Sequence, residues 1–339
     1  MKKLLFILSV IMLACLTSCS KEETGLLPWL QDPEELSRHP VKPTVNETPI
    51  TRPMFLSKED MKKMARNGLR SYSWKLFRQL YEERQQDKSA QQNLLISPYN
   101  IITTLNEQVG DSNKLKKFEL MRKIGINDCS EEVIEELYDH INTFLSLDDK
   151  VSVINDANNP RFKAHWGTLF KMDYTQEGSF RQADGSYKQM EMMISAGNFC
   201  YSRKAENYIL TKVRIGSYLM LFFVIPFYGH SIDEVVKSFD ITDLDMNFNR
   251  YFNFKVPKFS VQDSTSLDLS VFGENISIRQ NVALSISEYG VNYEPEPWEK
   301  KTERREWMGE DFFFLDQPFI YGIIERTTNI PLYIGYYGY

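Results

Sequence analysis

The sequence has few of the residue types that build catalytic or metal-binding sites. It contains four cysteines and four histidines among 339 residues. None of the histidines stands in a zinc-protease, serine-hydrolase, phosphate-loop or dinucleotide-binding pattern. They lie far apart, at His39, His140, His165 and His230. We therefore expect no catalytic residue, no cofactor and no metal, and we do not expect an enzyme.

An excess of charge of one sign is also missing. Lys and Arg number 40 and Asp and Glu number 46, which gives a formal net charge of -6, and the two signs are interspersed. A phosphate backbone attracts a basic patch or stripe, so we expect no nucleic-acid partner. Hydrophobic residues make up 42% and aromatic residues 13%. This is enough for a substantial core in one large domain or two smaller ones.

The hydrophobic runs are too short to span a bilayer as permanent helices. The first run, from Leu4 to Leu16, follows two lysines, which is the order of parts in a bacterial secretory signal. The small residues before Cys19 resemble the lipobox of bacterial lipoproteins. We interpret residues 1–18 as a signal peptide and Cys19 as an acylated N-terminus. The alternative is an ordinary signal peptide with an incidental cysteine.

The segment after Cys19 is hydrophilic and acidic, from Ser20 to Glu23, and resembles a surface-export signal of Gram-negative lipoproteins. We expect an exported lipoprotein at the outer membrane or cell surface, attached to the membrane through its N-terminal lipid only. Disulfides can persist outside the cytoplasm. Cys129 and Cys200 are therefore either one disulfide or two buried thiols.

Prolines interrupt the chain repeatedly before residue 57. Residues 19–57 are thus interpreted as a lipid-anchored, proline-rich linker. Ser57-Lys58-Glu59-Asp60 has the spacing of a capping box, so the folded domain, residues 58–339, is predicted to open with a helix.

Apolar residues recur at helical spacing up to about residue 148 and follow strand patterns after it. Ser97-Pro98 offers an N-cap followed by proline at the first helical position. The apolar stripe from Val133 to Leu145 predicts a further helix. Ile209 to Phe227 predicts two strands turned at Gly216-Ser217. The order of the elements indicates an α+β protein.

Five segments resemble blocks of the serpin superfamily and occur in that family's order. They cover most of Ser71 to Tyr339 and imply a serpin-like fold, with N-terminal helices plus large mixed and antiparallel sheets. The segments are Asn-Leu-Leu-Ile-Ser-Pro-Tyr-Asn-Ile from 93 to 101, Phe-Lys-Ala-His-Trp from 162 to 166, the pair Met192-Met193, Val-Pro-Lys-Phe from 256 to 259, and Asp-Gln-Pro-Phe-Ile from 316 to 320.

The chain departs from the family in one connection, between Ile126 and Phe162. It is much shorter than usual, so some helices and strands of the usual fold are expected to be missing. One helix, from Glu131 to Leu145, and one strand, from Val151 to Ile154, are expected to remain. Ser97 and Pro98 match the region about which the main sheet opens, whereas Asn100 replaces the serine usual there.

The resemblance also implies a reactive loop, about residues 288–315, that begins with a hinge. In inhibitory serpins the hinge enters the main sheet as a central strand once a protease has cut the loop. Glu288 and Gly290 match its start, but no run of alanines follows. Prolines lack the N–H donor that a central strand needs, which disfavours insertion. The hinge residues are Glu288, Gly290, Val291, Tyr293, Pro295 and Pro297.

The family's usual interval from Glu288 places the bait bond between Glu303 and Glu306. Arg304 or Arg305 would suit a trypsin-like protease. The alternative is that these charges form only a solvated run.

The resemblance implies a serine-type endopeptidase inhibitor, acting as a monomer, with a trypsin-like or cysteine protease as its partner. The hinge disfavours irreversible trapping. The alternative is a non-inhibitory serpin that serves as an interaction or ligand-binding protein.

Overall fold

The computed structural model describes residues 57–86, 93–109, 119, 122–123, 131–147, 151–154, 161–166, 170–195, 200–245, 250–268, 277–293 and 312–338. The predicted signal peptide, the linker up to residue 56 and most of the reactive loop lie outside these ranges. So do Cys19, Cys129, Pro295, Pro297, Arg304 and Arg305.

The described chain runs from helices to strands, as the spacing of apolar residues predicts. The first part holds α2 (Lys58–Gln86), β1 (Leu94–Ile96), α3 (Pro98–Val109) and α5 (Glu131–Leu147). The elements that follow are β2 (Val151–Ile154), β3 (Arg161–His165), η2 (Met172–Tyr174), β4 (Gln176–Arg181), β5 (Tyr187–Ile194), β6 (Cys200–Lys204), β7 (Tyr208–Ile215), β8 (Leu219–Pro226), α6 (Ile232–Ser238), η3 (Ile241–Asp245), β9 (Arg250–Pro257), β10 (Phe259–Asp268), β11 (Ser277–Ser287), β12 (Gly290–Val291), β13 (Phe312–Phe314), β14 (Phe319–Glu325) and β15 (Pro331–Tyr337).

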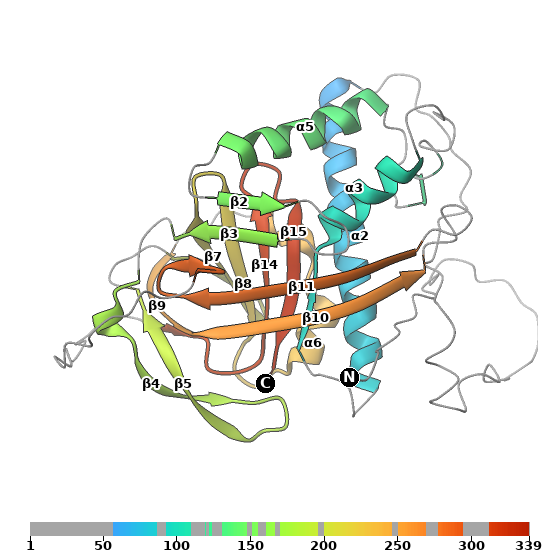
Figure 1. The fold of residues 1–339 in the computed structure, drawn as a ribbon. Coiled ribbons are helices and arrows are strands. Elements are labelled where there is room, and N and C mark those ends of the chain that lie inside the picture. Colours follow the sequence, from blue (N-terminus) through green and yellow to red (C-terminus); the bar gives the residue numbers. More distant parts are fainter. Residues whose placement is uncertain are drawn as a thin grey trace, which may run out of the picture.

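The strands form two sheets (Figure 1). A ten-stranded sheet has the order β1-β15-β14-β8-β7-β6-β9-β5-β4, with β13 paired to β9. A five-stranded sheet has the order β10-β11-β12-β3-β2 and runs across the first in Figure 1. Apart from the parallel pair of β13 and β9, the pairings within both sheets are antiparallel.

Aromatic side chains fill the space between the sheets. The ring of Phe259 on β10 lies 5.4, 5.1 and 4.8 Å from the rings of Phe319, Tyr321 and Tyr337. The neighbouring residue on β15, Tyr336, points to the opposite face and contacts Tyr81 of α2 at 4.9 Å. Strands β8, β14 and β15 are therefore buried at every residue, which explains their continuous apolar runs.

The short connection before Phe162 ends in an antiparallel pair of strands. Strand β2 pairs directly with β3, from Val151 opposite Ala164 to Ile154 opposite Arg161. Helix α5 and strand β2 are the elements that the sequence predicts for this region.

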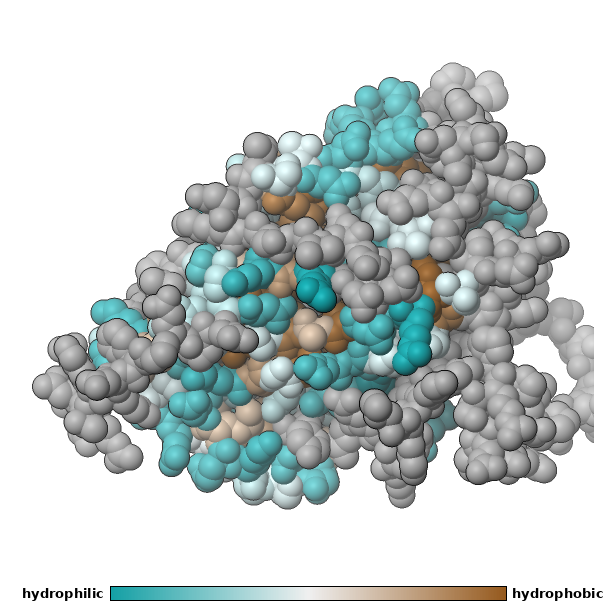
Figure 2. All heavy atoms as spheres, viewed as in Figure 1, coloured by the Kyte–Doolittle hydropathy of each residue, from teal (hydrophilic) through white to brown (hydrophobic). Residues whose placement is uncertain are grey.

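The outer face of the five-stranded sheet is polar. Exposed residues alternate with buried ones along β11, and β3 shows the same alternation. Figure 2 shows this side of the molecule, where hydrophobic side chains among the coloured residues appear only in small separate areas. The exposed residues include Arg161, Lys163, Ser260, Gln262, Arg279 and Asn281.

Two buried arginines fix α2 to the sheets. Near the end of the helix, Arg84 forms an ion pair of 2.5 Å with Asp263 of β10, and both side chains are almost fully buried. The second carboxylate oxygen of Asp263 accepts a 2.8 Å hydrogen bond from the Leu95 N–H. This contact ties α2, β1 and β10 together.

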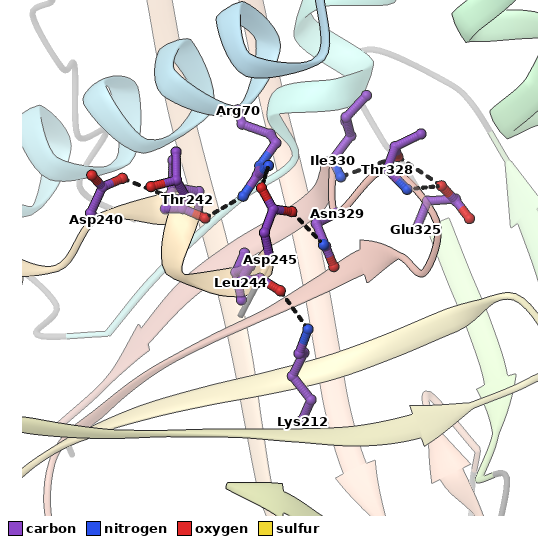
Figure 3. A network of polar contacts seen from close by, with 11 residues as sticks. Arg70, Lys212, Asp240, Thr242, Leu244, Asp245, Glu325, Thr328, Asn329 and Ile330 are labelled. Atoms are coloured by element: carbon purple, nitrogen blue, oxygen red, sulfur yellow. Dashed lines mark hydrogen bonds and ion pairs between the residues drawn. The ribbon is translucent and has the colours of Figure 1, made fainter. Parts of the chain in front are cut away.

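Arg70 in the middle of α2 makes the second attachment (Figure 3). Its guanidinium donates to the Asp245 carboxylate at 2.7 Å and to the Ile241 carbonyl at 2.6 Å. Asn329, in the turn before β15, donates to the other Asp245 oxygen at 2.8 Å. Helix α2 is thus joined to η3 and, through η3, to the last hairpin of the chain.

Candidate functional site

The candidate site lies where β11 ends and the chain turns back into the sheet. Strand β11 pairs with β10 from Ser277 opposite Asp268 to Ile286 opposite Phe259. A two-residue turn at Glu288-Tyr289 then leads into β12, whose Gly290 lies opposite Ser287. The predicted start of the hinge is therefore a tight hairpin.

Strand β12 lies between β11 and β3 and pairs with both. Val291 lies opposite Ile286 on one side and Ala164 on the other, and Gly290 lies opposite His165. Gly290 has a φ of 142°, and an added Cβ would lie 2.0 Å from the Ala164 carbonyl oxygen. Only glycine fits this position. Two hinge residues thus already occupy a central strand.

The side chain of Glu288 holds this hairpin in place. Its side chain is almost completely buried. One oxygen accepts a 2.7 Å hydrogen bond from the Thr175 hydroxyl, and the other forms a 3.2 Å ion pair with Lys258. Burial alone would lower the pKa of Lys258, but the carboxylates of Glu191 and Glu288 outweigh burial and raise that pKa above its ordinary value. The Lys258 ammonium is therefore charged throughout the neutral range.

Further contacts hold the turn against β3 and η2. The indole N–H of Trp166 donates to the Ser287 carbonyl at 2.7 Å. The Nδ1 atom of His165 lies 3.1 Å from the Tyr289 carbonyl oxygen, and the Tyr289 hydroxyl lies 3.2 Å from the Met172 sulfur. Residues of the segment from 162 to 166 thus contact the hinge directly.

The chain leaves the sheet at Asn292, which has a left-handed φ of 56°. Its side-chain oxygen accepts from the Ser285 N–H at 2.6 Å, and its amide nitrogen donates to the Phe162 carbonyl at 2.5 Å. The ring of Tyr293 then stacks on His165, with 3.8 Å between ring centroids. Sequence reasoning missed Asn292, although asparagine adopts the left-handed conformation more readily than other residues with side chains.

A second group of predicted residues lies beneath β11, about 23 Å along the strand from Ser287. The Ser97 N–H donates to the side-chain oxygen of Gln280 at 2.7 Å. The Ser97 carbonyl accepts from the side-chain nitrogen of Gln280 at 3.2 Å. Asn100 donates to the Ser97 hydroxyl at 2.6 Å, and Pro98 begins α3. Gln280 was missed because nothing near it in sequence marks it as a partner of Ser97.

The predicted residues thus form two clusters on the same strand. Glu288, Gly290, Val291 and Tyr293 meet at the end of β11. The residues predicted for the sheet-opening region, Ser97, Pro98 and Asn100, lie under its first half. Among the residues that the structure describes, no group of three or more His, Cys, Asp or Glu side chains could hold a metal ion. None of the described helices has the length and hydrophobicity to cross a membrane.

A separate cavity of about 770 Å³ lies beside β13. Aromatic and apolar residues supply much of its lining, including Ile225, Tyr228 and Phe314. Arg181 and Asp316 add charge at its wall, and partial burial raises the pKa of Asp316 above its ordinary value. The cavity has the mixed lining of a site for an amphipathic molecule.

Residues 157–337 match the family model described as Serpin (serine protease inhibitor). This match covers more than half of the chain, and the chain belongs to the serpin family. Members of this family are generally protease inhibitors and not catalysts.

Solved serpin structures share this fold. The chain is similar to Serpin48 from the insect Tenebrio molitor, with 12% identity and a TM-score of 0.62 over 84% of this chain and 99% of that chain. Human thyroxine-binding globulin shows 16% identity and a TM-score of 0.64 over 83% and 98%. Mouse protein-Z dependent protease inhibitor shows 12% identity and a TM-score of 0.60 over 84% of this chain and 100% of that chain. No curated relative matches significantly. Because these structures include both a protease inhibitor and a thyroxine-binding globulin, the fold leaves the activity open.

Proposed function

We propose that this serpin is an exported lipoprotein of the outer membrane or cell surface that binds a trypsin-like protease reversibly through its reactive loop. Arg304 or Arg305 would occupy the specificity pocket of the protease, and Cys19 would carry the lipid. The observation that carries the proposal is the hinge, which enters the sheet for two residues and leaves it at Asn292.

The register of β12 explains why further insertion is unfavourable. Val291 is buried opposite Ile286, so Tyr293, Pro295 and Pro297 would follow it on the inner face. The Asn292 N–H points to the Ser285 carbonyl on β11. The N–H positions of 293, 295 and 297 would therefore face β3. Both prolines lack that donor, and each leaves a carbonyl unpaired at a cost of about 1–3 kcal/mol.

The test combines kinetics with denaturing gels. The full chain in detergent is incubated with trypsin, and residual activity is followed before and after dilution. We expect competitive inhibition that reverses on dilution, with slow cleavage after Arg304 or Arg305 and no complex of summed mass on the gel. A denaturant-resistant complex would contradict the proposal.

A matched pair of variants identifies the bait. Replacing both Arg304 and Arg305 with alanine is expected to abolish inhibition of trypsin. Replacing the exposed Lys237 of α6 with alanine is expected to leave inhibition unchanged. Equal inhibition by both variants would show that the charged run is not the bait.

The cavity beside β13 supports a second candidate function, the binding of an amphipathic small molecule. Thyroxine-binding globulin shows that the serpin fold can carry such a ligand. The probe is 8-anilinonaphthalene sulfonate, an anionic aromatic dye. Saturable binding that is lost when Phe314 and Tyr228 are replaced by alanine, but kept in Tyr187→Ala, would favour this function. Tyr187 is 71% exposed on β5 and does not line the cavity. Unsaturable binding would argue against it.

A further inference from the structure

Strands β11 and β3 both continue past the point where β12 stops. In the antiparallel register, the positions after Val291 lie opposite Ser285, Leu284 and Ala283 on β11 and opposite Lys163 and Phe162 on β3. The backbone groups of these residues that face the missing strand need partners, because an unpaired backbone group inside a sheet is costly.

The side chain of Asn292 supplies these partners. Its oxygen accepts from the Ser285 N–H, where the backbone carbonyl of a continuing strand would accept. Its nitrogen donates to the Phe162 carbonyl at 2.5 Å and to the Ala283 carbonyl at 3.3 Å. Those are the carbonyls that the N–H groups of residues 293 and 294 would reach if the strand continued. One side-chain amide thus occupies the place of the next two residues.

The backbone of Asn292 directs the following residue away from this place. Its φ of 56° is incompatible with an extended strand. Tyr293 therefore lies over the outer face of β3, stacked on His165, with the Lys163 ammonium 4.1 Å from its ring centre. The Ser287 hydroxyl donates to the Tyr293 carbonyl at 3.1 Å. These contacts fix the chain outside the sheet.

We infer that Asn292 is the stop residue that limits hinge insertion to Gly290 and Val291. The inference rests on the proposed function, since it explains how the hinge of a non-trapping serpin is held. Further insertion requires Asn292 to become extended and to give up its amide contacts with both strands. Withdrawal of β12 breaks the same contacts. Asn292 therefore opposes movement of the hinge in both directions.

The first test measures hydrogen exchange in the full chain. Asn292→Gly keeps the left-handed backbone accessible and removes the amide, so the hairpin itself should remain. We expect the Ser285 amide to exchange about tenfold faster in this variant, as for the loss of one hydrogen bond at a buried backbone group. Asn281→Ala on the outer face of β11 is the control and should leave Ser285 unchanged. Unchanged protection of Ser285 in Asn292→Gly would overturn the inference.

The second test asks whether Asn292 limits insertion independently of the prolines. Three variants are cut with trypsin and melted: Pro295→Ala/Pro297→Ala, the same pair with Asn292→Ala, and Asn292→Ala alone. We expect a rise in Tm after cleavage only in the triple variant. A rise in the double proline variant, with Asn292 in place, would overturn the inference. A covalent complex formed by the unaltered chain would instead overturn the proposed function, and the exchange result would still stand.

Discussion

Arg70 shows how a single buried charge is stabilised by residues far away in the sequence. It has no exposed surface, and its partners Ile241 and Asp245 follow it by 171 and 175 positions. A buried guanidinium is tolerated only when it is paired and hydrogen-bonded. The contact therefore fixes where η3 lies on α2.

Asp245→Asn removes the charge that balances Arg70. We expect a loss of about 2–4 kcal/mol in the free energy of unfolding, because the buried arginine loses its ion pair. Urea denaturation monitored by tryptophan fluorescence measures the change. The control is Asp240→Asn. Asp240 is exposed, and its carboxylate accepts a 2.8 Å hydrogen bond from the Thr242 N–H, which an asparagine there can still accept. Equal stability of the two variants would refute the pairing.

Because of Glu83 on α2, we expect the free energy of unfolding to depend on pH. Burial, opposed by a hydrogen bond from Gln79, raises the pKa of Glu83 to about 8. A carboxyl whose folded pKa is raised contributes full stability below its unfolded pKa of about 4.5 and loses it as pH rises towards 8. Glu83→Gln should therefore match the unaltered chain at pH 4.5 and exceed it by about 3–5 kcal/mol at pH 9, because one pKa unit corresponds to about 1.4 kcal/mol.

Thermal melts across this pH range check the prediction. Glu59→Gln, on the same helix with an exposed side chain, is the control for the loss of one carboxyl group. A constant difference between Glu83→Gln and the unaltered chain at all pH values would contradict the shift.

At the scale of elements, the sequence predicts those helices and strands that local residue patterns determine. The helix from Glu131, the strand at Val151 to Ile154 and the two strands turned at Gly216-Ser217 all appear in the structure. The serpin blocks predict the order of elements, and the short connection predicts one helix and one strand before Phe162, which the structure shows as α5 and β2. These features depend on periodicity and chain length, which a single sequence contains.

The contacts that hold the hinge could not be predicted in the same way. Asn292 bonds to Phe162 across 130 positions, and Gln280 bonds to Ser97 across 183. Polar residues at such positions look like ordinary surface residues until the strands are paired. Glu288 and Gly290 were recognised by resemblance, but the depth of insertion depends on register and could be read only from the structure.

Gly290→Ala tests whether β12 stays paired within the sheet. The added Cβ would clash with the Ala164 carbonyl, so we expect β12 to leave the sheet and stability to fall by about 2–4 kcal/mol. The control is Gly185→Ala, whose φ is also positive at 84° but whose Cβ would meet nothing within 4 Å. It should cost only about 1 kcal/mol. Hydrogen exchange in the β3 and β11 segments reports the displacement, and equal effects of both substitutions would refute it.

At the scale of the whole molecule, the two sheets have different roles in the fold. The ten-stranded sheet is sealed by helices and by the second sheet, and its central strands β8, β14 and β15 have no exposed residue. The five-stranded sheet keeps one polar face and holds the hinge within it. Changes in the hinge therefore need not disturb the sealed core, so a serpin that has lost trapping can keep a stable fold.

The proposed lipid anchor decides where this domain would meet a protease. Cys19→Ser removes the thiol sulfur at which the lipid would be attached, so we expect the chain to move from the detergent phase to the aqueous phase in a phase-separation assay. Cys15→Ser is the matched control, because that cysteine lies within the hydrophobic run of the signal and should leave partitioning unchanged. If Cys19→Ser stays in the detergent phase, the segment is an ordinary signal peptide and another part of the chain binds the membrane. The domain would then still meet a protease at the membrane, held there by contacts other than a lipid on Cys19.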